Sequence, residues 1–190
     1  MEHQVEIILN EHIQNMQLLR SSDYSKALAK ISNEIIRCLK NGNKILIAGN
    51  GGSASDAQHF AGEMVGRFLL ERSAFSAIAL NTDTSVITCI GNDYSFDEVF
   101  SRQVDGIGKS GDIFIGISTS GNSKNIINAV ESAKMRDMKT ICFLGKDGGK
   151  LKKISQLNLI IPFEKTARIQ EAHILAIHTI CELVEKEMVK

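Results

Sequence analysis

The sequence predicts an α/β fold built on a five-stranded parallel sheet that helices cover on both faces. Short apolar segments of strand length alternate with longer segments of helical periodicity, and this alternation is typical of βαβ units. Some short segments are apolar at every position, as in Ile113-Phe114-Ile115-Gly116-Ile117. A strand without polar positions has to be buried on both faces, which is the situation in a doubly wound parallel sheet.

Two amphipathic helices precede the first strand. From about Val5 to Leu19, apolar residues recur at helical spacing with polar residues between them. Ser22 or Asp23 can cap a second helix, whose apolar stripe runs from Leu28 to Leu39 before Asn41-Gly42 ends it.

Five candidate strands follow, at residues 44–48, 76–80, 112–118, 140–144 and 157–161. A helix is expected to begin near Ala54, another covers 124–135, and a long final helix runs from about 166 to 188. The single proline, Pro162, follows the last strand, where it cannot disturb the ladder of hydrogen bonds. Since no repeat, low-complexity tract or linker interrupts the pattern, one domain over 1–190 is predicted.

Composition argues against several classes of partner. Twenty-two basic residues balance 22 acidic ones, so no overall field would gather nucleic acid or an anionic membrane surface. The N-terminus lacks a basic region followed by an apolar run, and no stretch approaches the roughly 20 apolar residues that span a bilayer. The cysteines lack the close pairs of zinc ribbons and redox motifs and are expected to be buried thiols in a reducing cytosol: Cys38, Cys89, Cys142 and Cys181. We therefore expect a cytoplasmic protein that binds neither nucleic acid nor membranes.

The loop after the third predicted strand is rich in hydrogen-bond donors. Its sequence is Ser118-Thr119-Ser120-Gly121-Asn122-Ser123, with four hydroxyls within six residues. Ligands of parallel α/β sheets bind at the carboxyl ends of strands, glycine lets a backbone approach closely, and the helix over 124–135 directs its first amides at the loop. An ordinary turn uses the same residue types, but so many donors after a buried strand favour a phosphate-binding loop.

A second glycine-rich turn, Gly49-Asn50-Gly51-Gly52-Ser53-Ala54, follows the first predicted strand. It nearly matches the dinucleotide fingerprint, so a nicotinamide-dependent reductase is the rival interpretation. That fingerprint also needs an acidic residue at the end of the second strand to hold the ribose, whereas the second strand here ends at Leu80-Asn81. A sugar phosphate spanning both loops at one edge of the sheet accounts for the two turns more economically.

Four side chains on two predicted helices can act as acid, base or metal ligand. His59 and Glu63 are four residues apart and hence on one helix face, where they can share a metal or a substrate, or form an exposed surface pair. Gln170 and His178 lie on the final helix, separated by about 12 Å along its axis. Either a metal lies midway between them, or they serve different copies of a site at a subunit interface. The other histidines, His3, His12 and His173, are expected to be packed or solvated.

The segment Gly-Ile-Ser-Thr-Ser-Gly-Asn-Ser at 116–123 resembles the signature of the sugar isomerase (SIS) domains. Further stretches resemble the phosphoheptose isomerase family, and with them the likeness covers nearly the whole chain: Gly49-Asn50-Gly51-Gly52-Ser53, Asp56-Ala57-Gln58-His59-Phe60, Gly91-Asn92-Asp93, Gly145-Lys146-Asp147-Gly148-Gly149 and Arg168-Ile169-Gln170-Glu171. The resemblance implies a three-layer αβα sandwich of flavodoxin-like topology. It also implies a homotetramer with active sites at subunit interfaces, in which the N-terminal helices, about 1–41, serve packing and oligomerisation.

The same resemblance implies an aldose-ketose isomerase. Its members convert D-sedoheptulose 7-phosphate to D-glycero-D-manno-heptose 7-phosphate through an enediolate, the first step of bacterial ADP- or GDP-heptose synthesis. Carried over by motif, the phosphate would be held by Ser118, Thr119, Ser120 and Ser123. The sugar would be lined by Asn50, Gly51, Gly52, Ser53, Asn92 and Asp93, together with Glu63 and Gln170. One zinc ion per subunit would be held by His59, Glu63, Gln170 and His178. We assign Glu63 as the base and His178 as its acid/base partner.

Two alternatives share the implied fold. DnaA initiator-associating proteins are non-catalytic tetrameric scaffolds, and the stretch Ala77-Ile78-Ala79-Leu80-Asn81-Thr82-Asp83 resembles them as much as the isomerases. In that group the positions of Glu63 and His178 lack these residues and both loops are degraded, whereas here all are intact, which favours catalysis. An isomerase of another phosphosugar is the second alternative. Where certain isomerases have an aspartate before Arg168, this chain has Ala167, so no acid is expected there.

Overall fold

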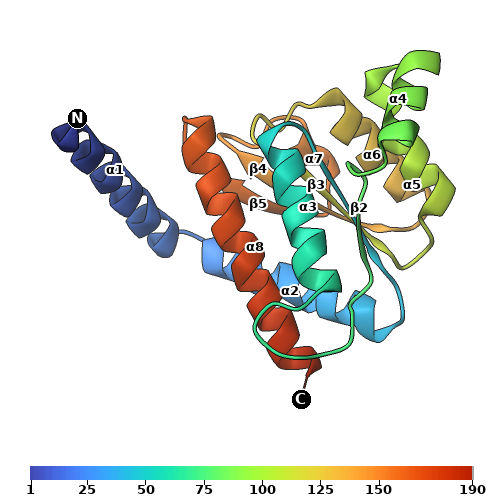
Figure 1. Ribbon diagram of the computed structural model, residues 1–190, viewed down its shortest axis with the longest axis horizontal. Helices are drawn as coiled ribbons and strands as arrows, with labels where there is room; N and C mark the ends of the chain where they lie inside the picture. The colour runs from blue at the N-terminus through green and yellow to red at the C-terminus, as the bar shows by residue number, and fades with distance from the viewer. Residues whose placement is uncertain (190) are drawn as a thin grey trace.

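The computed structural model describes residues 1–189 and contains one five-stranded sheet (Figure 1). The strands are β1 (Ile45–Gly49), β2 (Ala77–Ala79), β3 (Ile113–Ser118), β4 (Lys139–Gly145) and β5 (Leu157–Ile161). All four pairings are parallel, and the strand order is β2-β1-β3-β4-β5. The predicted five-stranded parallel sheet is confirmed, and its order is that of the flavodoxin-like folds.

Helices cover both faces of this sheet, forming the three-layer αβα sandwich (Figure 1). One face carries α2 (Tyr24–Lys40), α3 (Gly52–Val65) and α8 (Thr166–Met188). The opposite face carries α4 (Thr84–Asp93), the 3-10 turn η1 (Phe96–Glu98), α5 (Ser101–Ile107), α6 (Lys124–Met135) and the short α7 (Leu151–Ile154). The remaining helix, α1 (Glu2–Ser21), projects from the body, and among its residues only Leu19 is buried.

Two separate hydrophobic clusters explain why β1 and residues 113–117 of β3 have no polar positions. Along β3, Ile113, Ile115 and Ile117 point into the cluster shared with α2, α3 and α8. Phe114, between them, points into the cluster under α5 and α6. Because successive side chains of a strand alternate between faces, a strand covered on both sides buries apolar side chains in both directions.

The segment between β2 and β3 forms helices that sequence periodicity did not assign. The helices α4 and α5 bury Ile90, Phe100 and Val104 against the second cluster, and Asp83 caps α4 by accepting a hydrogen bond from the Val86 amide at 3.0 Å. Short helices of about two or three turns give a weak periodic signal. The prediction of four buried thiols is wrong for Cys89, which is exposed on α4, while the other three cysteines are buried.

Within residues 1–189, no helix combines the length and the apolar character needed to cross a bilayer.

Candidate active site

The two donor-rich loops meet at the point where the strand order reverses. Strands β1 and β3 are neighbours, but the connections that leave their carboxyl ends cross to opposite faces of the sheet, which opens a crevice between the loops. Asn50 and Asn125 bridge this crevice with reciprocal side-chain amide hydrogen bonds, both of 2.9 Å. The predicted convergence of the two loops at one edge is therefore present in the fold.

The loop from β3 to α6 has the shape of a phosphate cradle. The hydroxyls of Ser118 and Ser123 lie 2.8 Å apart, and Ser120 lies 3.5 Å from Ser118. Gly121 has a φ of +64°, and a Cβ placed on it would lie 2.1 Å from the carbonyl oxygen of Gly148. The loop is thus packed tightly on the loop after β4, and the helix α6 begins directly after its last serine, where helix amides can bind an anion.

The glycine turn after β1 leads directly into α3. Gly51 has a φ of +56°, and Ser53, in the first turn of the helix, is buried. Asn81 follows β2 and clamps this turn, since its side chain accepts from the Gly49 amide at 3.3 Å and donates to the Gly49 carbonyl at 2.7 Å. The position where a dinucleotide fold needs an acidic residue for the ribose therefore holds an amide with a structural role, which argues against the reductase interpretation.

His59 and Glu63, farther along α3, lie close to His178 of α8. The Nε2 atoms of His59 and His178 are 2.9 Å apart, and the Glu63 carboxylate lies 3.4 Å from His59 Nε2. The ring of Phe68 stacks on His178 with centroids 5.5 Å apart. Two imidazole nitrogens at this distance can share one proton in a hydrogen bond or can both turn their lone pairs to a cation.

Gln170 lies nearer the N-terminal ends of α3 and α8 than His59 and His178 do. A Cβ built on Gly52 would lie 2.3 Å from Gln170 Nε2, so this amide rests against the glycine turn at the start of α3. Since α3 and α8 both start at the carboxyl edge of the sheet, they descend side by side (Figure 1), and His59 and His178 lie about 10–12 Å farther down. Within one chain, Gln170 therefore lies against the glycine turn after β1, while His178 faces His59.

Asn92 and Asp93 occupy the end of α4. The Asn92 side-chain amide donates to Asp93 Oδ1 at 2.8 Å, and Cys89 Sγ donates to Asp93 Oδ2 at 3.4 Å. The hydrogen bond from Asn92, followed by that from Cys89, holds the pKa of Asp93 below its ordinary value. Between residues 1 and 189, neither side chain has a hydrogen bond to the cradle, so their contact with a substrate stays a prediction.

Asp56 is a candidate that sequence reasoning missed. It is three residues before His59 on α3, it is buried, and its Oδ2 atom has no hydrogen-bond partner. Burial raises the pKa of this carboxyl to about 6, and the neighbouring His59 lowers it by a smaller amount. The helical spacing i, i+3 to His59 was the available signal, although spacing alone does not reveal burial.

Taken over all residues that the structure describes, no group of three or more His, Cys, Asp and Glu side chains is arranged to hold a metal ion. His59, Glu63 and His178 are nevertheless donors of the kinds that bind zinc, namely two imidazoles and a carboxylate. The donor chemistry therefore fits zinc, while the fourth expected ligand, Gln170, lies at the level of Gly52.

A donor-rich cradle at the switch point of a parallel sheet, with a carboxylate and two imidazoles nearby, defines a phosphosugar-binding α/β protein equipped for proton transfer. A family model described as the SIS domain matches residues 11–145. The chain is 53% identical over 180 residues to a phosphoheptose isomerase from Citrifermentans bemidjiense, covering 95% of this chain and 93% of that protein. It is 51% identical over 182 residues to one from Helicobacter pylori, covering 95% of each.

Solved structures agree with these relatives. A phosphoheptose isomerase from Neisseria gonorrhoeae superimposes with a TM-score of 0.92 at 45% identity, covering 97% of this chain and 98% of that one. One from Francisella tularensis gives the same TM-score at 35% identity, covering 97% of each. The chain belongs to the phosphoheptose isomerase family of SIS domain enzymes.

Proposed function

We propose that this chain isomerises D-sedoheptulose 7-phosphate to D-glycero-D-manno-heptose 7-phosphate, the reaction that opens bacterial ADP- or GDP-heptose synthesis. The observation that carries the proposal is the combination of a donor-rich loop between β3 and α6 with a carboxylate and a pair of imidazoles on α3 and α8. The names of its relatives supply the seven-carbon substrate. The cradle by itself is compatible with any sugar phosphate.

Binding starts at the cradle. The hydroxyls of Ser118, Ser120 and Ser123 converge, Thr119 lies between them in the chain, and the first amides of α6 add their positive dipole end, so a phosphate can be held without a lysine. A Cβ on Gly51 would meet nothing within 4 Å, which leaves room for the sugar chain beside this turn, while the Gln170 amide packs against Gly52 and can contact the sugar from there. Anchoring the phosphate reduces the freedom of the reacting carbons, which lowers the entropic part of the barrier.

Proton transfer is assigned to Glu63 and His178. Moving the carbonyl between C1 and C2 requires a base to remove a proton from the carbon beside the carbonyl and an acid/base group to exchange the oxygen proton. Glu63, with its carboxylate 3.4 Å from His59, takes the carbon proton, and the His178 imidazole exchanges the oxygen proton. His59, at 2.9 Å from His178, orients that imidazole.

Zinc is proposed as the metal of this site, with one ion per subunit. The candidate ligands are His59, Glu63, Gln170 and His178, of which His59, Glu63 and His178 are grouped within one chain. When bound, zinc supplies Lewis-acid polarisation of the sugar oxygens.

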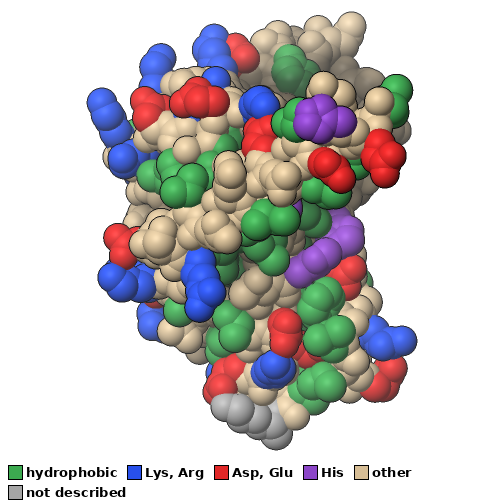
Figure 2. All heavy atoms as spheres, turned by 90° about the vertical axis from the view of Figure 1, so that its left-hand side faces the viewer, with side chains coloured by type: hydrophobic (Ala, Val, Ile, Leu, Met, Phe, Trp, Pro, Cys, Tyr) green, Lys and Arg blue, Asp and Glu red, His purple; other side chains and the backbone are tan. Residues whose placement is uncertain are grey.

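We also propose that the enzyme works as a homotetramer with active sites at subunit interfaces. Exposed apolar side chains along α1 support this assembly: Val5, Ile7, Ile8, Leu9, Ile13 and Leu18. Figure 2 looks at the molecule from the side on which α1 projects, and hydrophobic and histidine side chains reach the surface there among charged ones. Many exposed apolar side chains on one helix indicate an interaction surface, and oligomerisation is the role expected for the N-terminal helices of this single SIS domain.

A cytoplasmic location and a small-molecule substrate complete the proposal. The described residues hold four free cysteines and three of them are buried, which suits a reducing compartment. A net charge of zero gives no electrostatic attraction for nucleic acid or anionic membranes.

The decisive experiment incubates the purified full chain with sedoheptulose 7-phosphate, with and without a chelator, and measures the aldose product. We expect product, loss of turnover on chelation, and recovery with added zinc. Ribulose 5-phosphate and fructose 6-phosphate, run in parallel, test the pentose and hexose alternatives, and faster turnover of either would overturn the heptose assignment. If no sugar reacts and the chain binds DnaA, the scaffold alternative replaces this proposal.

A further inference from the structure

The loop at residues 66–76, between α3 and β2, is held by one buried carboxylate. Glu185 Oε1 accepts hydrogen bonds from the Phe68 amide at 3.1 Å and from Arg72 Nε at 2.9 Å. Its Oε2 accepts from the Leu69 and Leu70 amides at 2.7 and 2.8 Å. The Glu185 side chain is 1% exposed and that of Arg72 is 3% exposed. Figure 1 shows the loop crossing the C-terminal half of α8, where Glu185 lies.

Charge at Glu185 is favoured in the folded protein. Burial pushes its pKa upward, but the hydrogen bonds from the Leu69, Leu70 and Phe68 amides and from Arg72 outweigh burial, so the pKa is lowered. An ionised carboxylate that fills its acceptor positions with loop donors fixes the loop far more firmly than an exposed ion pair does.

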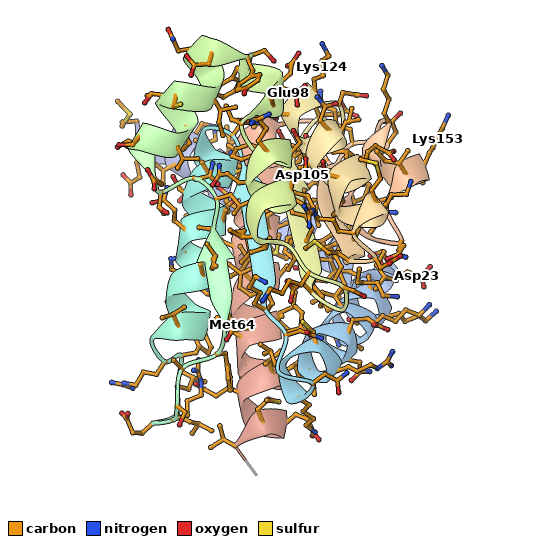
Figure 3. All side chains as sticks on the ribbon, turned by 90° about the vertical axis from the view of Figure 1, so that its right-hand side faces the viewer. Asp23, Met64, Glu98, Asp105, Lys124 and Lys153 are labelled. Carbon is orange, nitrogen blue, oxygen red and sulfur yellow. The ribbon has the colours of Figure 1, made fainter. Side chains whose placement is uncertain are left out.

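Arg72 extends this attachment to the end of α3. Its guanidinium donates to the Glu63 carbonyl at 2.8 Å and to the Met64 carbonyl at 2.9 Å, which are among the carbonyls that the end of a helix leaves without internal partners. Figure 3 labels Met64 in this last turn of α3. The turn that carries Glu63 is therefore held through Arg72.

Phe68 connects the same loop to His178 on α8. Its amide is bound by Glu185, and its ring stacks on the His178 imidazole at 5.5 Å with an interplanar angle of 29°. His178 and Glu185 are seven residues apart on α8, so they lie two turns apart on one face of that helix. The loop thus links both assigned proton-transfer groups through a single ion pair.

We propose that the Arg72–Glu185 ion pair is a positioning device for the reaction, which holds the Glu63 turn through Arg72 and the His178 ring through Phe68. This inference rests on the proposed function, and it makes Phe68, Arg72 and Glu185 positioning residues that act through Glu63 and His178. The aromatic ring at position 68 sets the orientation of the His178 imidazole. A loop with only a structural role would contribute stability and leave turnover per folded molecule unchanged.

The test compares Phe68→Leu with Phe68→Tyr in the full chain, measuring kcat and KM for sedoheptulose 7-phosphate. Phe68→Leu keeps apolar volume but removes the ring, and we expect kcat to fall roughly tenfold with KM within about twofold, since misplacing a catalytic group lowers turnover. Phe68→Tyr keeps the ring and should restore kcat. Phe100→Leu, in the cluster on the opposite face, is the matched control and should leave kcat unchanged. An unchanged kcat in Phe68→Leu, or no recovery in Phe68→Tyr, overturns the proposal.

Glu185→Gln tests whether the ion pair acts through the same contact. An amide has one acceptor oxygen in place of two, so loop attachment is lost and kcat should fall as in Phe68→Leu. The double variant should be no slower than the slower single variant, because both remove one interaction. Multiplicative losses would show independent effects and refute the link. If Glu185→Gln does not fold, the comparison of Phe68→Leu with Phe68→Tyr decides alone.

A spectroscopic measurement separates this inference from the proposed reaction. With five histidines in the chain, the ring C–H signals of His178 can be assigned by their loss in His178→Gln. Phe68→Leu should shift these signals at fixed pH because the stacked ring is gone, while Phe100→Leu should not. An inactive wild-type chain that still shows this shift contradicts the proposed function alone, and an active chain without it contradicts the positioning role.

Discussion

The Nε2 atoms of His59 and His178 lie 2.9 Å apart although 119 residues separate them in the sequence. The contact exists because α3 and α8 leave the same edge of the sheet and pack on the same face. Glu63 joins them from the next turn of α3, at 3.4 Å from His59. Two helices whose first residues border the proposed substrate loops therefore also carry the residues to which we assign proton transfer.

Glu63→Gln and His178→Gln are each expected to abolish measurable turnover, because neither amide can accept and return a proton at neutral pH. Loss of a positioned acid or base costs about 10²- to 10⁴-fold in rate. The measurement is kcat for sedoheptulose 7-phosphate, with circular dichroism and sedimentation showing that the assembly is retained. Glu131→Gln is the matched control, since Glu131 pairs with Lys134 on the solvent-facing side of α6. A near-normal rate in either variant would remove that residue from the mechanism.

The sequence predicted the parts of this molecule that depend on chain-local patterns. The five strands and the long α8 follow from apolar periodicity, and the cradle follows from the clustered hydroxyls after β3. The helices at 84–107 were not predicted because they are short, and a short helix gives a weak periodic signal.

Features that depend on packing between distant segments could not be predicted from the sequence. The Glu185 carboxylate and its loop donors are separated by more than 110 residues, and nothing in the local pattern around Glu185 indicates burial. The same is true of the reciprocal amide pair between Asn50 and Asn125. The proposed catalytic and metal-binding roles rest on the family resemblance, because helical spacing shows that residues share a face but does not show their chemistry.

Ser123→Ala should weaken phosphate binding more than chemistry. Its hydroxyl lies 2.8 Å from that of Ser118 at the cradle, and a hydrogen bond to a charged group contributes about 1.5–3 kcal/mol. We expect KM to rise roughly tenfold or more with kcat less affected. Ser155→Ala, which removes a hydroxyl bonded to the Leu151 carbonyl before β5, should leave KM unchanged. An unaltered KM in Ser123→Ala would place the phosphate elsewhere.

Gly121→Ala should damage both stability and phosphate binding. The φ of +64° is a conformation that L-residues other than glycine rarely adopt, and the new Cβ would lie 2.1 Å from the Gly148 carbonyl oxygen. The backbone strain alone costs on the order of 1–3 kcal/mol, and the loop must move to relieve the collision. We expect a lower midpoint of urea unfolding together with a raised KM. Gly62→Ala, where a Cβ meets nothing within 4 Å, should instead be tolerated, and equal behaviour of the two variants would contradict the tight loop contact.

His173 should make the folded protein sensitive to acid. It is fully buried on α8, its Nε2 donates to the Leu144 carbonyl at 3.2 Å, and its Nδ1 has no partner. Burial, partly opposed by that hydrogen bond, lowers the pKa of the imidazole from 6.5 to about 4. The neutral ring therefore contributes stability in full above pH 6.5. That contribution is lost as pH falls toward 4, because His173 becomes protonated in the unfolded chain while it is still neutral in the folded chain.

The contribution of His173 to acid sensitivity has to be measured by comparing wild type with a His173 variant, because protonation of Asp56 has the opposite effect on stability. The pKa of Asp56 is raised to about 6, so protonation between pH 6 and 4 favours the folded state and offsets part of the loss at His173. The shift at His173 corresponds to about 3 kcal/mol at pH 4. Urea unfolding of wild type and His173→Leu from pH 7.5 to 4.5 should show the variant losing less stability on acidification. The gap between the two free energies of unfolding should change by roughly 2 kcal/mol over that range, and parallel curves would show that His173 does not titrate as a buried neutral ring.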